Sequence, residues 1–336
     1  KMIILLLAVV FPLHARAAST DLTIEMIAFY DNEFSKAFQK LIPAGTRKSD
    51  FVSSLMNSVN KKLELLLSDV NVTVFLAKVN VESTFSTNPH HPDIIKVPDD
   101  VKKFEERQRT DAEVKRADLV FMLTRGTLVP AVPNGQGHRE NAFFFTTELR
   151  YISGPNLCSM ADYAVKGSLC SQDKFVLARI KPQFNDYTIV MTRDILTVLN
   201  ADKDGEGSAT KCPASEKKLM SGALEPAIPW TFSSCTKESV GEYIKTLAES
   251  CKQRHFRSRA YGRYNRTLLP GELFDRNKAC SSLGAKPKHD CTNDTDKRNC
   301  RYKCCDSRTA ISSHTTTFLD GGYCESKKKC INAQCV

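Results

Sequence analysis

The sequence predicts an α/β fold: a three-layer sandwich around a mixed, mostly parallel sheet, followed by a small disulfide-rich C-terminal domain. Three observations carry this prediction. Strand-like apolar segments alternate with amphipathic segments from residue 22 onward. The helical periodicity stops beyond residue 251, where Cys, Gly, Pro and charged residues take over. Eight of the 13 cysteines fall within residues 280–336, as in small domains held by disulfides.

Residues 1–17 predict a secretory signal peptide. An apolar run from Ile3 to Leu13 is followed by Ala15 and Ala17, small residues at the spacing that signal peptidase requires. The run is shorter than the roughly 20 residues that cross a bilayer, so we expect no membrane span. Thirteen cysteines agree with an extracellular location, and their odd number leaves one thiol free or paired with another molecule. The sequence therefore predicts a secreted, extracellular protein.

The first part of the sandwich contains two strands and a helix. Residues 22–31 form an apolar, partly β-branched strand. Residues 49–67 show apolar positions at steps of three and four, which predicts an amphipathic helix that Ser49 or Asp50 can cap. In residues 70–81 apolar side chains outnumber polar ones, which predicts an inner strand of the sheet.

The middle part continues the alternation. Residues 97–115 predict one charged, mostly exposed helix, and residues 117–125 predict a buried strand. Residues 141–152 predict a further strand at an edge. The order of strands and helices is that of a layered α/β protein with a mostly parallel sheet.

The last part of the sandwich contains the candidate site residues. The short apolar run 187–191 predicts a strand, residues 192–202 a helix, and residues 236–250 a final amphipathic helix. We place the boundary near residues 251–266, which gives a sandwich domain over 18–251 and a basic, Cys-rich domain over 252–336.

The stretch from Arg193 to Gly207, with Leu-Met-Ser-Gly at 219–222 and Phe-Ser-Ser-Cys at 232–235, resembles the reprolysin or adamalysin branch of the metzincin zinc proteases. That family carries HExxHxxGxxH and then a Met-turn. In that motif two histidines on one helix face bind zinc, and the glutamate is the general base. The glycine lets the chain turn so that a third histidine completes the coordination of the zinc.

The resemblance places unsuitable side chains at the zinc positions. A guanidinium offers no lone pair, two cations repel a dication, and threonine is a poor zinc ligand. We therefore expect no catalytic residue, no bound metal and no cofactor; zinc enters only if the alternative of an active enzyme holds. Asn200, at the glycine position, tolerates a left-handed backbone. The degenerate ligand positions are Arg193, Thr197 and Lys203, the degenerate general-base position is Asp194, and the Met-turn residue is Met220.

Asp194 has two further interpretations. It is either a solvated residue on its helix or a carboxylate paired with Arg193 or Lys203. As a general base it would have no metal-bound water to act on.

The tail is also similar to known proteins. Leu-Pro-Gly-Glu-Leu-Phe-Asp at 269–275, Cys-Arg-Tyr-Lys-Cys at 300–304 and the last 17 residues resemble the disintegrin-like and Cys-rich segments of thrombospondin-motif-bearing reprolysins. The whole chain is most similar to arachnid secreted forms, as in tick saliva or scorpion venom. The resemblance implies the disulfides Cys170–Cys251 and Cys212–Cys235 and leaves Cys158 as the odd cysteine. The alternative is Cys158–Cys170, which would release Cys251 to the tail.

The positive charge is confined to the tail. Residues 252–336 hold 18 Lys and Arg against 8 Asp and Glu, which equals the whole excess of +10. Basic residues interleaved with aromatic ones predict a polyanion site, and in a secreted chain the polyanion is a heparin-like glycosaminoglycan rather than nucleic acid. The alternative is a solvated surface segment. The candidate site comprises Lys252, Arg254, Arg257, Arg259, Arg263 and Arg266, and the candidate glycosylation sites are Asn71, Asn265 and Asn293.

These observations predict a secreted metalloprotease homologue without catalytic activity. It would bind extracellular host or matrix proteins and sulfated glycans. The alternative is an active zinc metalloendopeptidase that cleaves extracellular proteins, so its status as an enzyme stays open. The chain contains no GxSxG elbow, no phosphate-binding loop and no dinucleotide fingerprint, which excludes those enzyme classes.

Overall fold

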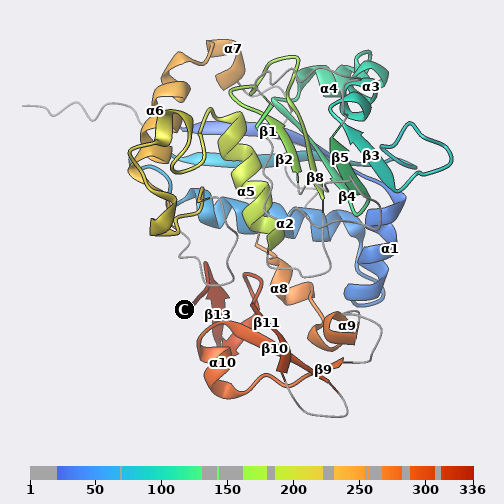
Figure 1. Ribbon diagram of the computed structural model, residues 1–336, viewed down its shortest axis with the longest axis vertical. Helices are drawn as coiled ribbons and strands as arrows, with labels where there is room; N and C mark the ends of the chain where they lie inside the picture. The colour runs from blue at the N-terminus through green and yellow to red at the C-terminus, as the bar shows by residue number, and fades with distance from the viewer. Residues whose placement is uncertain are drawn as a thin grey trace, which may run out of the picture.

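A computed structural model describes residues 21–68, 70–130, 142–143, 162–179, 186–221, 231–253, 256, 267–281, 288–306 and 312–336. The predicted fold class is confirmed: helices cover a mixed, mostly parallel sheet, and a disulfide-rich region follows (Figure 1). The expected signal peptide and most of the expected strand 141–152 lie outside the described residues.

The main sheet has six strands in the order β2-β1-β4-β8-β7-β6. The first four are mutually parallel, β7 is antiparallel to β8, and β6 is antiparallel to β7. A separate parallel pair, β3 and β5, lies beside it. The bounds are β1 Leu22–Tyr30, β2 Val72–Val81, β3 Ile94–Val97, β4 Leu119–Thr124, β5 Thr127–Pro130, β6 Ala142–Phe143, β7 Asp162–Val165 and β8 Phe175–Arg179.

Strand β1 divides the core into two halves because its side chains alternate between the faces of the sheet. Ile24 and Met26 pack with helices α1, α2, α5 and α6, whereas Ile27 and Phe29 pack with α3 and α4. The result is three layers, with α2 running along one face of the sheet (Figure 1). The helices span α1 Asn32–Leu41, α2 Lys48–Leu63, α3 Asp99–Gln108, α4 Ala112–Arg116, α5 Asp186–Val198, α6 Ser234–Thr246 and α7 Glu249–Lys252.

Strand β2 is not an inner strand as expected from its composition. Among the described residues it lies at the edge of the main sheet. Its apolar side chains are covered from one face by α2. The apolar composition of a strand reflects how much of it is buried. An edge strand that is covered by a helix can therefore have the same composition as an inner strand of the sheet.

The expected strand 187–191 is wrong: these residues form the first half of α5. Every residue from Thr188 to Leu199 is buried. A helix that is buried on all sides has no polar face, so its short apolar run cannot be told from a strand by periodicity.

Helix ends also differ from the expectations. Helix α2 begins after Arg47, which makes no side-chain cap, and Asp50 instead accepts hydrogen bonds from the Arg47 guanidinium. The single helix expected over 97–115 is two, because Asp111 caps a new helix with its carboxylate. The last helix of the sandwich begins after Ser233 and is followed by the short α7.

The C-terminal region contains two small antiparallel sheets, β9 to β11 and β12 to β14. Its eight cysteines all pair with one another, and Tyr302 and Phe318 complete its core. The elements are α8 Pro270–Leu273, α9 Arg276–Ser281, β9 Lys288–Asp290, α10 Asp294–Arg298, β10 Arg301–Asp306, β11 Ser312–Thr317, β12 Tyr323–Glu325, β13 Lys328–Ile331 and β14 Gln334–Cys335.

This region packs against the sandwich below α1 and α2 (Figure 1). Lys62 of α2 and Asp320 form an ion pair at 2.6 Å, and their side chains are only 1% and 3% exposed. Ala279 and Leu319 belong to the same apolar core as the helices of the sandwich. No helix among the described residues has the length and apolar character to cross a bilayer.

Candidate functional site

The candidate site lies on α5 and on the turn that follows it. Arg193, at the first degenerate zinc position, is 1% exposed. Its Nε donates to the carbonyl oxygen of Leu219 at 2.6 Å, and its Nη2 donates to that of Ser221 at 2.5 Å. These two carbonyls flank Met220, which is fully buried. The guanidinium therefore ties α5 directly to the loop that carries Met220.

Asp194 is fully buried, so it is not a solvated helix residue. Among the described residues neither of its carboxylate oxygens accepts a hydrogen bond from Arg193 or Lys203. Burial raises the pKa of Asp194 well above its ordinary value, and the neighbouring carboxyl of Asp162 raises it further, whereas Arg193 lowers it. Asp162, on β7, is itself 1% exposed. Two adjacent buried carboxyls ionise together only at a high cost, so the raised pKa of Asp194 favours a proton shared with Asp162.

The other two degenerate positions are also enclosed. Thr197 is 1% exposed, and within the described part of the chain its hydroxyl has no hydrogen-bond partner. Lys203 is 8% exposed. Burial lowers the pKa of Lys203, the nearby Glu206 and Asp162 carboxylates raise it, and Arg193 lowers it. The structure thus brings all the predicted positions together, but inside the protein rather than in an open cleft.

Hydrogen bonds and a left-handed residue shape the turn after α5. Asn200 has φ of 73°, which confirms the left-handed backbone expected at the glycine position. Burial would raise the pKa of Asp202, but hydrogen bonds from Lys166 and Ser208 lower it. Hydrogen bonds inside the protein therefore hold the loop.

Asp204 joins this loop to α6 and to Met220. Its carboxylate accepts a hydrogen bond from the Ser233 hydroxyl at 2.5 Å, and its backbone N–H donates to the Met220 carbonyl at 3.1 Å. Ser233 is the N-cap of α6, so Asp204 links Met220, through its backbone, to the start of the next helix, through its carboxylate.

These residues do not fit a zinc ion. A catalytic zinc site needs three lone-pair donors and an open fourth position for water or substrate. Arg193 has no lone pair to offer, and its Nε and Nη2 already donate to backbone carbonyls. Thr197 and Asp194 lie too deep for a substrate to reach. The arrangement can hold the loop in place, and it offers no position for an activated water.

The shared proton predicts a pH-dependent effect of Asp194→Asn. The folded-state pKa of Asp194 is raised, so its contribution is fully present below the unfolded pKa of about 4 and is lost as pH rises toward the folded value. An amide stays neutral and still donates to Asp162. We expect Asp194→Asn to match wild type near pH 4 and to melt at a higher temperature at pH 7 to 8.

Thermal unfolding measured across this pH range checks the prediction. Burial also raises the pKa of Asp31, to about 6, but this group is present in both proteins and cancels in the comparison. A difference in melting temperature that stays constant with pH contradicts the shared proton.

The disulfides of the sandwich are Cys170–Cys251 and Cys212–Cys235, the two pairs that the resemblance implies. Since Cys170 is bonded to Cys251, the alternative bridge from Cys170 to Cys158 is wrong; Cys158 itself lies outside the described residues. The first bridge ties α7 to the loop between β7 and β8, and the second closes the loop that carries Met220.

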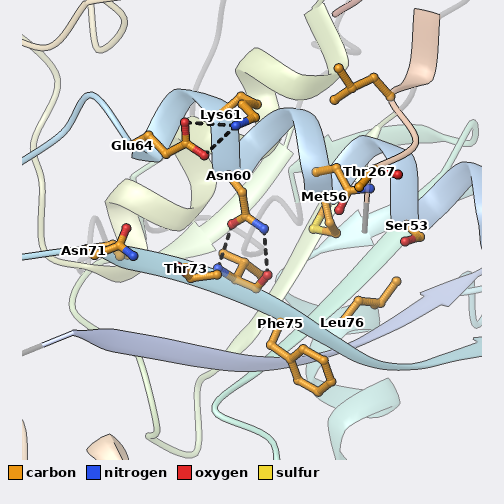
Figure 2. Close-up of a pocket in the computed structure, with 14 residues that line it drawn as sticks. Ser53, Met56, Asn60, Lys61, Glu64, Asn71, Thr73, Phe75, Leu76 and Thr267 are labelled. Carbon is orange, nitrogen blue, oxygen red and sulfur yellow. Dashed lines mark hydrogen bonds and ion pairs between the residues drawn. The ribbon is translucent and has the colours of Figure 1, made fainter. Parts of the chain in front are cut away.

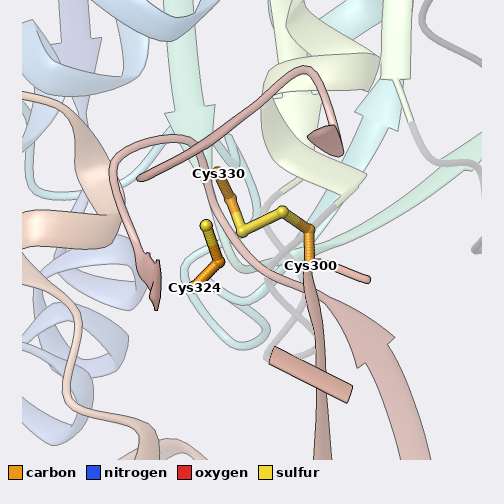
Figure 3. A group of neighbouring side chains, drawn as sticks. All are labelled: Cys300, Cys324 and Cys330. Carbon is orange, nitrogen blue, oxygen red and sulfur yellow. A yellow bond between two sulfur atoms is a disulfide. The ribbon is translucent and has the colours of Figure 1, made fainter. Parts of the chain in front are cut away.

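Two groups of three potential metal ligands occur among the described residues, and both contain bridged cysteines. Cys300, Cys324 and Cys330 form one group, in which Cys300 is bonded to Cys330 and Cys324 to Cys335 (Figure 3). The other combines Asp118 with the Cys170–Cys251 bridge. A sulfur in a disulfide is no thiolate, so neither group has the donors of a thiolate metal site.

No family model matches the chain, and no curated protein matches it. Among solved structures, one match is a structure of a chaperone-substrate complex at 12% identity and a TM-score of 0.34; it covers 56% of this chain and 25% of that chain. Another is the crystal structure of archaemetzincin from Methanopyrus kandleri at 11% identity and a TM-score of 0.34, covering 68% of this chain and 98% of that chain. Membership of a protease family therefore stays a proposal.

Of the predicted polyanion site, the described residues include Lys252. Lys252 ends α7 and pairs with Glu249 at 3.0 Å. Arg254, Arg257, Arg259, Arg263 and Arg266 lie outside the described residues, as does the sequon at Asn265. The other two sequon residues, Asn71 and Asn293, are exposed.

Sequence reasoning missed a groove along β2. It has a volume of about 470 Å³ and lies between α2, β2 and residues 267–269 (Figure 2). Asn60 of α2 reaches the edge of the strand: its side-chain nitrogen donates to the Val74 carbonyl at 2.9 Å, and its oxygen accepts from the Val74 N–H at 2.8 Å. One side-chain amide thus replaces a peptide group of a neighbouring strand. No sequence signal marks Asn60, because it occupies a polar position of an amphipathic helix.

Asn60→Ala is expected to make the protein associate through this edge. The change frees an N–H and a carbonyl of an edge strand, which pair readily with another chain. Analytical ultracentrifugation over increasing protein concentration should show dimers or larger species for Asn60→Ala and a monomer for wild type. Asn60→Asp, which still accepts from Val74 but cannot donate, should fall between them. Equal sedimentation of all three proteins would show that the amide does not protect the edge.

Proposed function

We propose that this chain is a secreted, non-catalytic relative of metzincin proteases that acts by binding extracellular proteins or matrix. The observation that carries the proposal is the position of Arg193. Its guanidinium is buried and donates to the carbonyls on both sides of Met220. A cation with no lone pair thus takes over the link between helix and Met-turn where the family motif would bind zinc.

Secretion and domain organisation belong to the same proposal. Six disulfides indicate an extracellular or secreted protein, because disulfides persist in oxidising compartments. We propose a signal peptide over 1–17, a sandwich domain over 18–251 and a basic tail over 252–336. The tail holds four of the six bridges and all of the excess positive charge.

The basic residues from Lys252 to Arg266 would bind a heparin-like glycosaminoglycan. The charge asymmetry supports this part of the proposal, because a protein that neutralises many anionic groups releases bound counterions. Binding to immobilised heparin should therefore weaken steeply as salt is raised.

A metal and activity assay tests the absence of catalysis. Purified protein is analysed for zinc per monomer after dialysis against zinc-containing buffer, and it is incubated with casein and with fibrinogen, with and without chelator. An active metzincin protease is treated in parallel. We expect no stoichiometric zinc and no chelator-sensitive cleavage from this protein. One zinc per monomer together with cleavage that the chelator stops would establish the alternative, an active zinc endopeptidase.

A further inference from the structure

A second concave site lies in the C-terminal region, away from α5. It has a volume of about 550 Å³ and is formed by α9, α10 and β12. Three cations, two carboxylates and one aromatic ring line it: Arg276, Lys297, Arg298, Asp294, Glu325 and Tyr323.

A helix cap and two disulfides hold the walls of this cavity. Asn293 and Asp296 form a capping box that fixes the start of α10. Cys300, two residues after the helix ends, is bonded to Cys330 of β13 (Figure 3). Cys324 of β12 is bonded to Cys335. A ligand therefore meets side chains that are already held in position, which lowers the entropy cost of binding.

The charges around the cavity leave a positive excess. Lys297 pairs with Asp294 at 3.2 Å, and Glu325 pairs with Lys328 at 3.4 Å. Arg276 is held by Asp290 at 3.2 Å, and its guanidinium lies 5.0 Å from the centre of the Phe318 ring. That arrangement uses the Nε of Arg276, and within the described residues nothing accepts from its terminal N–H groups, which leaves them for a ligand.

Arg298 is the cation that these pairs do not neutralise. It is exposed at the end of α10, and none of the described residues forms a hydrogen bond or ion pair with its side chain. With Lys328 and Asp290, which pair with residues of the lining, four cations face three carboxylates around the cavity. The rest of residues 252–336 adds to the positive field.

Tyr323 supplies a flat surface at the same place. Its side chain is 58% exposed, although it is one of the larger apolar groups of the protein. Lys329 lies 5.5 Å from the ring centre and is itself held by Glu272 at 2.5 Å, which fixes the surroundings of the ring. An exposed ring beside guanidinium groups fits a sugar ring that carries anionic substituents, since its C–H face packs on the ring and its sulfate accepts from arginine.

We propose that this cavity binds a sulfated saccharide unit. Arg298 and the terminal N–H groups of Arg276 hold a sulfate, Tyr323 packs against the sugar ring, and the Asp294 and Glu325 carboxylates accept hydrogen bonds from its hydroxyls. This inference rests on the proposed glycan binding and adds to it a defined subsite that lies outside the basic stretch 252–266.

Isothermal titration with a heparin-derived oligosaccharide of defined length tests the subsite. All proteins carry Thr295→Ala, which removes the sequon beside the cavity and leaves the Asn293 cap in place. We expect Arg298→Ala to weaken binding about tenfold, the loss of one charged hydrogen bond. Tyr323→Ala should also weaken it, whereas Tyr323→Phe should not. The matched control is Arg301→Ala, an exposed cation on β10 that does not line the cavity and should change little.

The outcomes separate this inference from the broader proposal. If the oligosaccharide binds but Arg298→Ala and Tyr323→Ala bind as tightly as Arg301→Ala, the cavity is not the subsite, and binding through residues 252–266 stands. If a fully desulfated oligosaccharide binds equally well, the sulfate recognition is wrong. If wild type binds no sulfated oligosaccharide, both glycan proposals fail, whereas the zinc assay still decides the question of catalysis.

Discussion

Lys62→Met should destabilise the protein by about 3–5 kcal/mol, the cost of leaving a buried charge without its partner. Lys62 donates to Asp320 at 2.6 Å and to the Ser58 hydroxyl at 3.1 Å, and all three side chains are buried. Methionine keeps the length of the side chain and removes the charge. Asp320 would then keep the Ser58 hydroxyl and the Asn332 N–H as donors but would have no cation.

The neighbouring residue on the same helix supplies the control. Lys61 pairs with Glu64, and both side chains are about half exposed, so Lys61→Met should cost less than about 1 kcal/mol. Denaturant unfolding under non-reducing conditions measures both variants. Similar losses from the two changes would show that the Lys62 ion pair does not hold the tail to the sandwich.

Gly271→Ala is expected to prevent normal docking of α8 against the turn at 319–322. A Cβ atom at this position would lie 2.2 Å from the backbone nitrogen of Gly322 and 2.6 Å from the carbonyl oxygen of Leu319. Both are backbone atoms, so no side chain can move aside. The N–H of Gly271 also donates to the Asp320 carbonyl at 2.8 Å, and this bond must break if the two segments separate. We expect a loss of several kcal/mol, within the range for overpacking combined with a broken hydrogen bond.

Gly241→Ala is the matched control, because its Cβ would meet only a Leu67 methyl at 3.9 Å. In the middle of α6 the change should raise stability by about 0.5–1 kcal/mol. Thermal unfolding and mapping of the tail disulfides test both variants. Native pairing and an unchanged melting temperature for Gly271→Ala would contradict the close approach of α8 and residues 319–322.

The fold class followed from the sequence because alternating strands and amphipathic helices can be recognised locally. Helix α1 was missed because Asp31, which appeared to end a strand, also caps the helix that starts at once. Strand order was not predictable either. The edge position of β2 depends on which strands pair, and pairing is a property of the whole sheet rather than of ten residues.

The candidate site, like the fold, could be predicted from the sequence only in part. Knowledge of what a guanidinium cannot do was enough to argue against zinc at Arg193. The carbonyls that it binds lie 26 and 28 residues further along the chain, and no local pattern points to them. Asp162, whose carboxyl adds to the effect of burial in raising the pKa of Asp194, lies on β7 and was not singled out.

An ion is lost when it dissociates, and chelators or acid speed its departure by competing for metal or protonating its ligands. The guanidinium that fixes the Met220 loop is part of the chain and stays charged at every physiological pH. The link between α5 and the Met220 loop therefore does not depend on a bound ion. It would survive in a solution that contains little free zinc, where a helix and loop joined by a bound metal ion would separate.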